Sequence, residues 1–255
     1  MRAILSRLVL LIAMAVTTSG QHAFANTPVS LIEGPASSKV IAVLELFTSQ
    51  GCSSCPPADR LLHTYAERDE LLALSYFVDI WDKLGWKDTL AHPRFTRRQK
   101  EYSTVRHDNQ IYTPQLVINA RSHVVGSNKE MIDAEIEKLR PNSGSLLDVD
   151  IGLQGEHLVI SLPGASHPVV AEATIWLVAY SPKVTVDVNV GENRGKSMTY
   201  ANVVRDITPV GVWSGKPLVL RLPRSAAGDG KSTRCAVIVQ RGGKAQIIGA
   251  AKLAP

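Results

Sequence analysis

The run VIAVLELFTSQGCSSCPP occupies residues 40–57. Its first part, Val40–Phe47, is almost entirely apolar, which predicts a strand buried on both faces by flanking helices. Cys52 and Cys55 follow, separated by two serines, and two prolines come next. Prolines in succession are tolerated only near the first turn of a helix. The run therefore predicts a buried strand, a turn that carries two cysteines, and the start of a helix.

Further helices and strands are predicted on the C-terminal side of this run. A stripe at Ala58, Leu61, Leu62 and Tyr65 predicts a helix over residues 56–68. Hydrophobic patterns then predict a strand, a helix, a hairpin and a closing helix: 71–80, 92–106, 116–119 with 123–126, and 128–139. This order predicts an α/β domain over residues 40–142.

Beyond residue 145 the pattern changes to short alternating runs separated by turn residues. Such spacing is typical of antiparallel β structure. We therefore expect an antiparallel all-β, sandwich-like second domain over residues 145–255. The runs are 147–151, 157–162, 173–180, 183–188, 218–222, 234–240 and 244–250.

The first residues predict an export signal. Arg2 and Arg7 precede the apolar run Leu8–Val16, and Ala23–Ala25 offers a cleavage site, so residues 1–25 are predicted to be removed and 26–39 to form a flexible leader. The expected location is the periplasm. Removing residues 1–25 lowers the formal net charge from +5 to +3, which gives no reason to expect nucleic-acid binding. No later segment is long enough to predict a membrane span.

Two features of residues 40 to about 140 resemble the thioredoxin superfamily. One is the C-x-x-C at a strand-to-helix junction, and the other is Tyr112-Thr113-Pro114-Gln115 just before a later strand. The resemblance implies a thioredoxin-like domain in which Thr113 and cis-Pro114 face the cysteines and orient a substrate. Residues 47–59, FTSQGCSSCPPAD, together with a β-rich tail, are also similar to a bacterial family catalogued as domain of unknown function 1223.

The cysteine pair predicts disulfide exchange. Cys52, just before a helix, would lie near unpaired N–H groups and the positive end of the macrodipole, which favour a thiolate. Cys52 is therefore the predicted attacking thiol and Cys55 the resolving thiol. The expected function is an exported thiol-disulfide oxidoreductase that acts on protein or small-molecule disulfides or dithiols. It needs a redox partner protein and no cofactor.

Glu45 stands in the apolar strand before the cysteines, where a carboxylate is costly unless it is neutral or paired. It resembles the buried acid that thioredoxin has on this strand. The resemblance implies a proton acceptor for Cys55. The alternative is a glutamate held in a salt bridge or facing an edge.

Trp81, Asp82 and Trp86 follow the second strand. Because carboxyl ends of parallel strands share one rim of a sheet, this loop is expected to border the cysteines and to shape a substrate-binding surface. The alternative is that the tryptophans anchor the loop or pack a domain interface.

Other polar residues in the chain are ambiguous. The basic run at Arg94, Arg97, Arg98 and Lys100 is expected to be a solvated helix face, with attraction of an acidic partner as the alternative. Cys235 reads as a buried core thiol or as a third redox thiol. The segment 191–195 reads as a turn, or as a feature packed against the cysteines.

Two other functions remain open. The first is a copper-binding chaperone that uses Cys52, Cys55 and a histidine, although no histidine stands at a recognisable ligand spacing. The second is a non-catalytic binding module with a static disulfide, in which the β-rich part engages a partner.

Overall fold

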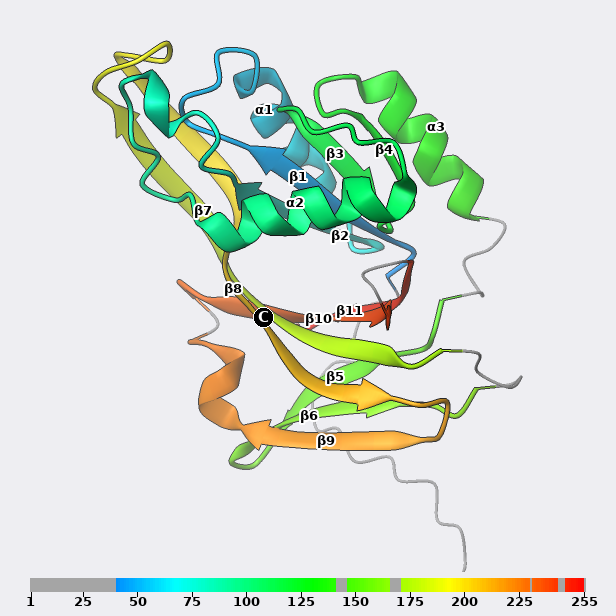
Figure 1. Cartoon of the computed structure of the whole chain (residues 1–255). Helices are drawn as coiled ribbons and strands as arrows, with labels where there is room; N and C mark the ends of the chain where they lie inside the picture. Colours follow the sequence, from blue (N-terminus) through cyan, green and yellow to red (C-terminus); the bar gives the residue numbers. More distant parts are fainter. Residues whose placement is uncertain (1–39, 141–145, 166–170, 230, 243–245, 255) are drawn as a thin grey trace, which may run out of the picture. The chain divides into compact units, whose positions relative to one another are not determined.

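The computed structural model describes residues 40–140, 146–165, 171–229, 231–242 and 246–254 (Figure 1). The predicted signal peptide and leader, residues 1–39, lie outside this part of the chain. Within the described ranges, no helix combines the length and the apolar composition that crossing a membrane requires.

A mixed sheet of eight strands is the centre of the α/β fold, in the order β11-β10-β7-β8-β2-β1-β3-β4. β2 runs parallel to both β1 and β8, and the other neighbours are antiparallel. The strands are β1 Ala42–Thr48, β2 Leu71–Phe77, β3 Gln115–Ile118, β4 Ser122–Val125, β7 Ala173–Val188, β8 Lys196–Trp213, β10 Arg234–Arg241 and β11 Ile247–Lys252.

A second, antiparallel sheet has three strands in the order β5-β6-β9. The helices complete the fold. The remaining elements are β5 Asp150–Gln154, β6 His157–Leu162, β9 Leu218–Pro223, α1 Pro56–Ala66, α2 Pro93–Arg106, α3 Lys129–Leu139, and the short 3-10 helices η1 Asp82–Leu84 and η3 Arg224–Ala227.

Alternation along β1 places helices on both faces of the large sheet. Leu44 and Leu46 pack in a core with residues of α1 and α3, whereas Val43 and Phe47 pack with Phe95 and other residues of α2. Successive side chains of a strand point to opposite faces, so one apolar strand supplies two cores. Figure 1 shows α2 crossing the sheet on the side opposite α1.

β10 extends the same two faces. Ala236 and Ile238 belong to the core under α2, while Val237 and Val239 pack against the three-stranded sheet. One face of the large sheet therefore carries a single core under α2. The other face is divided between the helices α1 and α3 and the second sheet.

The sequence predicted that the β-rich tail forms a sandwich-like domain of its own, and this prediction is wrong. Four of its strands continue the sheet of the preceding α/β part, because the long β8 joins β2 (Figure 1). Ser75 Oγ donates to the Ala201 carbonyl at 2.8 Å, and Asn202 Nδ2 donates to the Ala73 carbonyl at 2.9 Å. An uncovered edge of β2 would leave backbone groups unpaired, and β8 covers this edge where Ser75 pairs with Val203. The expected domain boundary, 142–145, lies outside the described residues.

Candidate redox site

The turn between β1 and α1, residues 49–55, is named the redox turn after the disulfide exchange that the sequence predicts for its cysteines. A disulfide joins Cys52 to Cys55. Cys55 is the N-cap of α1, with Pro56 and Pro57 in the first helical positions. Its carbonyl accepts the Asp59 N–H at 3.1 Å, so regular helix begins here. The predicted position of the cysteines, at a strand-to-helix junction, is confirmed.

The two cysteines differ little in exposure. Cys52 is 4 % exposed and Cys55 is fully buried, while Ser53 and Ser54 between them are exposed. The Cys52 sulfur lies 3.4 Å from the Ser54 hydroxyl. Of the two cysteines, only Cys52 has any solvent-exposed surface. The Ser54 hydroxyl lies within hydrogen-bond reach of its sulfur.

Trp81 links the redox turn to the segment before β3. Its indole N–H donates to the Thr113 hydroxyl at 2.7 Å. A Cβ added at Gly51 would stand 3.1 Å from the Trp81 Cβ, so a side chain at this position would crowd the tryptophan. The Thr113–Pro114 bond is cis, as predicted. A substrate contact of these residues stays a prediction.

Trp86 and Asp82 support the turn through its buried glutamine. Trp86 donates its indole N–H to Gln50 Oε1 at 2.8 Å. The Gln50 backbone N–H donates to Asp88 Oδ2 at 2.7 Å, and Asp82 accepts the backbone N–H of Asp88 at 3.1 Å. The loop contacts the redox turn at Gln50 and Gly51, and contact with the cysteines themselves stays a prediction. The hydrogen bonds correspond to the loop-anchoring alternative, and contact with a substrate stays a prediction.

The tail also holds the redox turn, through the loop between β7 and β8. Asn193 is fully buried and donates its amide to the carbonyls of Gln50 and Cys52, both at 2.9 Å. Its own Oδ1 accepts the Lys196 ammonium at 2.8 Å, and Glu192 accepts the Ser53 N–H at 3.2 Å. Segment 191–195 therefore packs against the cysteines, the second of the two readings that the sequence left open.

Replacing Asn193 with alanine is expected to lower the free energy of unfolding by about 1–3 kcal/mol, because two enclosed carbonyls lose their donor. Urea unfolding of the oxidised protein measures the change. Arg194→Ala, an exposed neighbour, is the control and is expected to differ from wild type by less than about 0.5 kcal/mol. Equal stabilities of the two variants would contradict the assigned role of Asn193.

A pair of buried carboxyls lies behind the turn. Burial raises the pKa of Asp59 to about 7, assisted by the negative charge of Asp88 and opposed by the Thr48 hydroxyl. Burial likewise raises the pKa of Asp88 to about 6, against the hydrogen bonds that it accepts from Gln50 and Leu90. Thr48 donates to Asp59 Oδ1 at 2.7 Å. Asp59 Oδ2 has no hydrogen-bond partner among the described residues.

Glu45 corresponds to the paired alternative. Arg98 Nε lies 2.8 Å from Glu45 Oε1, and Tyr102 donates its hydroxyl to Oε2. Both partners belong to α2, on the face of the sheet opposite α1. The expected solvated basic face is wrong for Arg98, whose side chain is 3 % exposed. Packing of α2 against the sheet, which includes the tail strand β10, encloses it.

Cys235 is a buried thiol. Its side chain lies in the core between the large sheet and the second sheet, and burial raises its pKa to about 12. This is the core-thiol reading, since a protonated, enclosed sulfur is a poor nucleophile. Within the described ranges, no three His, Cys, Asp or Glu side chains gather as a metal site.

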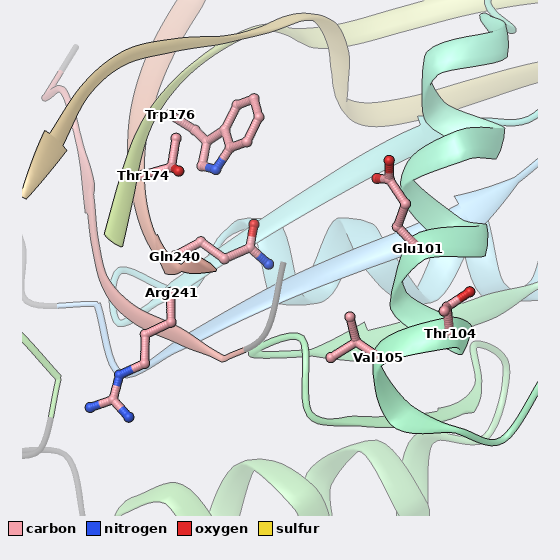
Figure 2. Close-up of a pocket in the computed structure, with 7 residues that line it drawn as sticks. All are labelled: Glu101, Thr104, Val105, Thr174, Trp176, Gln240 and Arg241. Atoms are coloured by element: carbon pink, nitrogen blue, oxygen red, sulfur yellow. The ribbon is translucent and has the colours of Figure 1, made fainter. Parts of the chain in front are cut away.

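A pocket of about 460 Å³ lies between α2 and the strands β7 and β10, and its described lining includes no residue of the redox turn. Figure 2 shows the side chains of Trp176, Gln240 and Glu101 directed into a common space, while Arg241 points away from it. The lining residues are Glu101, Thr104, Val105, Thr174, Trp176, Gln240 and Arg241.

The model of a family described as "Protein of unknown function (DUF1223)" matches residues 43–240. The chain belongs to this family. The matched range includes the redox turn, Asp59 and Asn193, so the contacts between turn and tail lie within the family's own region. No curated protein matches the chain.

Two solved structures are similar to this chain. A crystal structure of an Agrobacterium tumefaciens protein from a structural genomics consortium shares 34 % identity, covers 85 % of this chain and 95 % of its own, and has a TM-score of 0.74. HBP35 of Porphyromonas gingivalis shares 13 % identity over 86 % of this chain and 75 % of its own, with a TM-score of 0.57. The second likeness concerns the fold alone.

Sequence reasoning missed the polar groups that support the turn. Asp59 carried a signal, because it follows Cys55 by one helical turn and adjoins the apolar stripe of α1. An acid on the buried side of a helix is unusual. Asn193 lies in segment 191–195, for which the sequence left open packing against the cysteines, but nothing singled out its side chain, since only the folded β7–β8 hairpin brings it to residue 52.

Proposed function

We propose that this protein is an exported thiol-disulfide oxidoreductase with a thioredoxin-like arrangement of its redox turn. The observation that carries the proposal is the Cys52–Cys55 pair at the N-terminus of α1 with the buried carboxyl of Asp59 one helical turn away. The positive end of the macrodipole at a helix N-terminus favours a thiolate. The proposed compartment is the periplasm, where a disulfide persists.

Cys52 is the attacking sulfur and Cys55 the resolving one. In the reduced protein the Cys52 thiolate attacks a substrate disulfide, forms a mixed disulfide and releases one substrate thiolate. Cys55 then loses its proton, attacks the Cys52 sulfur and releases the second thiolate. Two electrons pass from the protein to the substrate, and a dithiol partner restores the reduced pair. The reverse sequence oxidises a substrate dithiol.

Asp59 replaces Glu45 as the proposed proton acceptor for Cys55. Residues separated by four positions on a helix lie side by side, and both side chains are buried. A base works best when its pKa is near the working pH, and that of Asp59 is about 7. Glu45 instead has both its oxygens engaged by Arg98 and Tyr102.

A Cys55→Ser variant tests the function. It retains the attacking thiol but cannot resolve, so mixed disulfides on Cys52 are expected to accumulate in the periplasm and to disappear on reduction. Cys52→Ser is the matched control and should form none, because Cys55 is enclosed and Cys235 is buried. Absence of any adduct on Cys55→Ser, with the variant folded, would remove the main support for the proposal.

A static disulfide in a binding module is the second candidate. The low exposure of Cys52 and the hydrogen bonds from Asn193 favour it. It predicts a strongly reducing potential and almost no exchange with small disulfides. Measuring the equilibrium potential of the pair separates the two functions.

A further inference from the structure

A second pocket, of about 520 Å³, borders the redox turn between α1 and the start of β8. Pro56, which lines it, follows Cys55 directly. Lys196, on the opposite wall, donates to Asn193, which in turn donates to the Cys52 carbonyl. The described lining is Pro56, Asp59, Arg60, His63, Lys196, Ser197, Met198, Thr199 and Tyr200.

The rim of this pocket is cationic. Arg60 on α1 and Lys196 on β8 are both exposed. His63 Nε2 lies 3.0 Å from the Thr199 carbonyl. Because a carbonyl only accepts, that nitrogen donates its hydrogen and leaves Nδ1 free for another partner. The positive charges of Arg60 and Lys196, one on each wall of the pocket, are suited to bind a carboxylate.

The inner wall carries one acid with an unused oxygen. Asp59 is 3 % exposed, and its Oδ2 has no partner among the described residues. The groups that act on it are the Thr48 hydroxyl on β1, Asp88 after η1 and Arg60 on its own helix, and it acts in turn on Tyr200 of β8. A buried acceptor without a donor is costly, and Asp59 lines the pocket, so a ligand N–H group that reached Oδ2 would remove this cost.

We propose that this pocket binds the carboxylate and the ammonium group of a small cysteine-derived thiol or disulfide, with Arg60 and Lys196 on the carboxylate and Asp59 on the ammonium. This substrate class rests on the proposed redox function. The sulfur of such a ligand would extend toward the neighbouring redox turn.

Three disulfides of equal chain length test the two halves of the recognition separately. Cystine carries carboxylates and ammonium groups, dithiodipropionate only carboxylates, and cystamine only ammonium groups. Cystine is expected to react fastest with the reduced protein. Arg60→Gln should slow cystine and dithiodipropionate about tenfold, the size of one lost charge-assisted contact, and leave cystamine unchanged. Arg97→Gln, an exposed change of equal charge on α2, is the control.

Binding without chemistry separates this proposal from the redox function. S-methylcysteine cannot exchange, and calorimetry with the oxidised protein should detect its binding and a tenfold loss in Arg60→Gln. If exchange proceeds with all three disulfides at rates that neither variant changes, the pocket proposal is wrong and the redox function stands. If S-methylcysteine binds as expected but no disulfide reacts, the pocket stands and the redox function is wrong.

Discussion

Replacing Arg98 with methionine is expected to lower the free energy of unfolding by about 3–5 kcal/mol, the usual cost of leaving one member of a buried ion pair alone. Glu45 is fully buried and would keep only the Tyr102 hydroxyl as a partner. The guanidinium also lies over the rings of Tyr102 and Trp176, at 4.9 and 6.0 Å from their centroids. Urea unfolding at pH 7 measures the loss.

Two further variants make this result specific. Arg97→Met changes the neighbouring, exposed arginine of α2 and should cost less than about 0.5 kcal/mol. Adding Glu45→Gln to Arg98→Met removes the stranded charge and should recover part of the loss. A loss below about 1 kcal/mol in Arg98→Met is typical of a solvent-exposed ion pair. It would contradict the enclosure of Arg98 and Glu45 between α2 and the sheet.

The same site separates stability from redox chemistry. Glu45→Gln keeps the size of the side chain and should leave the pH dependence of disulfide exchange unchanged, because its oxygens are occupied on the α2 face. The sequence favoured neither of its two roles, since a glutamate in an apolar strand fits both. Only its partner, Arg98 on α2, decides between them.

Local patterns predicted the elements around the cysteines well. The apolar run before Cys52 and the prolines after Cys55 each act within a few residues, so the strand, the turn and the helix start are where the sequence indicated. The same holds for the helix beginning at Pro93, whose N-cap is His92. Short-range stereochemistry is sufficient for such features.

The sequence did not predict which strands far apart in the chain pair with each other. The strand β8 was not predicted, and β7 was divided at Pro182, although the two form one long hairpin. Alternating hydrophobic runs do not show which strand will pair with which, so the pairing of β8 with β2 could not be predicted. Asn193 reaches the redox turn only through that pairing, and this is why the sequence assigned it no chemical role.

Replacing Asp59 with asparagine is expected to remove the part of the pH dependence of stability that this carboxyl contributes between about pH 4 and pH 7. The folded-state pKa of this carboxyl is about 7, against 3.8 for the ordinary group. Between these values the folded protein holds a proton that the unfolded chain has released, so the wild type loses stability as pH rises through this window. About three pH units at about 1.4 kcal/mol each correspond to about 4 kcal/mol.

Asparagine resembles the protonated acid and can still accept the Thr48 hydroxyl, so the variant should be more stable than wild type at pH 8 and similar at pH 4. Asp88, whose pKa burial raises to about 6, keeps its own contribution to the slope in the variant. Asp69→Asn, an exposed carboxyl just beyond α1, is the control and should keep the wild-type slope. Equal slopes in wild type and Asp59→Asn would show that Asp59 is ionised in the folded protein throughout the window.

A gain in stability from Asp59→Asn should come with a loss in redox rate. An asparagine cannot accept the Cys55 proton, so resolution of a preformed mixed disulfide on Cys52 is expected to slow about a hundredfold at pH 7. The deficit should shrink as pH rises and hydroxide replaces the missing base, which a purely structural role would not produce. Burial of Asp59 lowers the stability of the folded protein near neutral pH because it destabilises the charged carboxylate. The same burial raises the pKa of the carboxyl and makes it a base of suitable strength, which gives its burial a functional role.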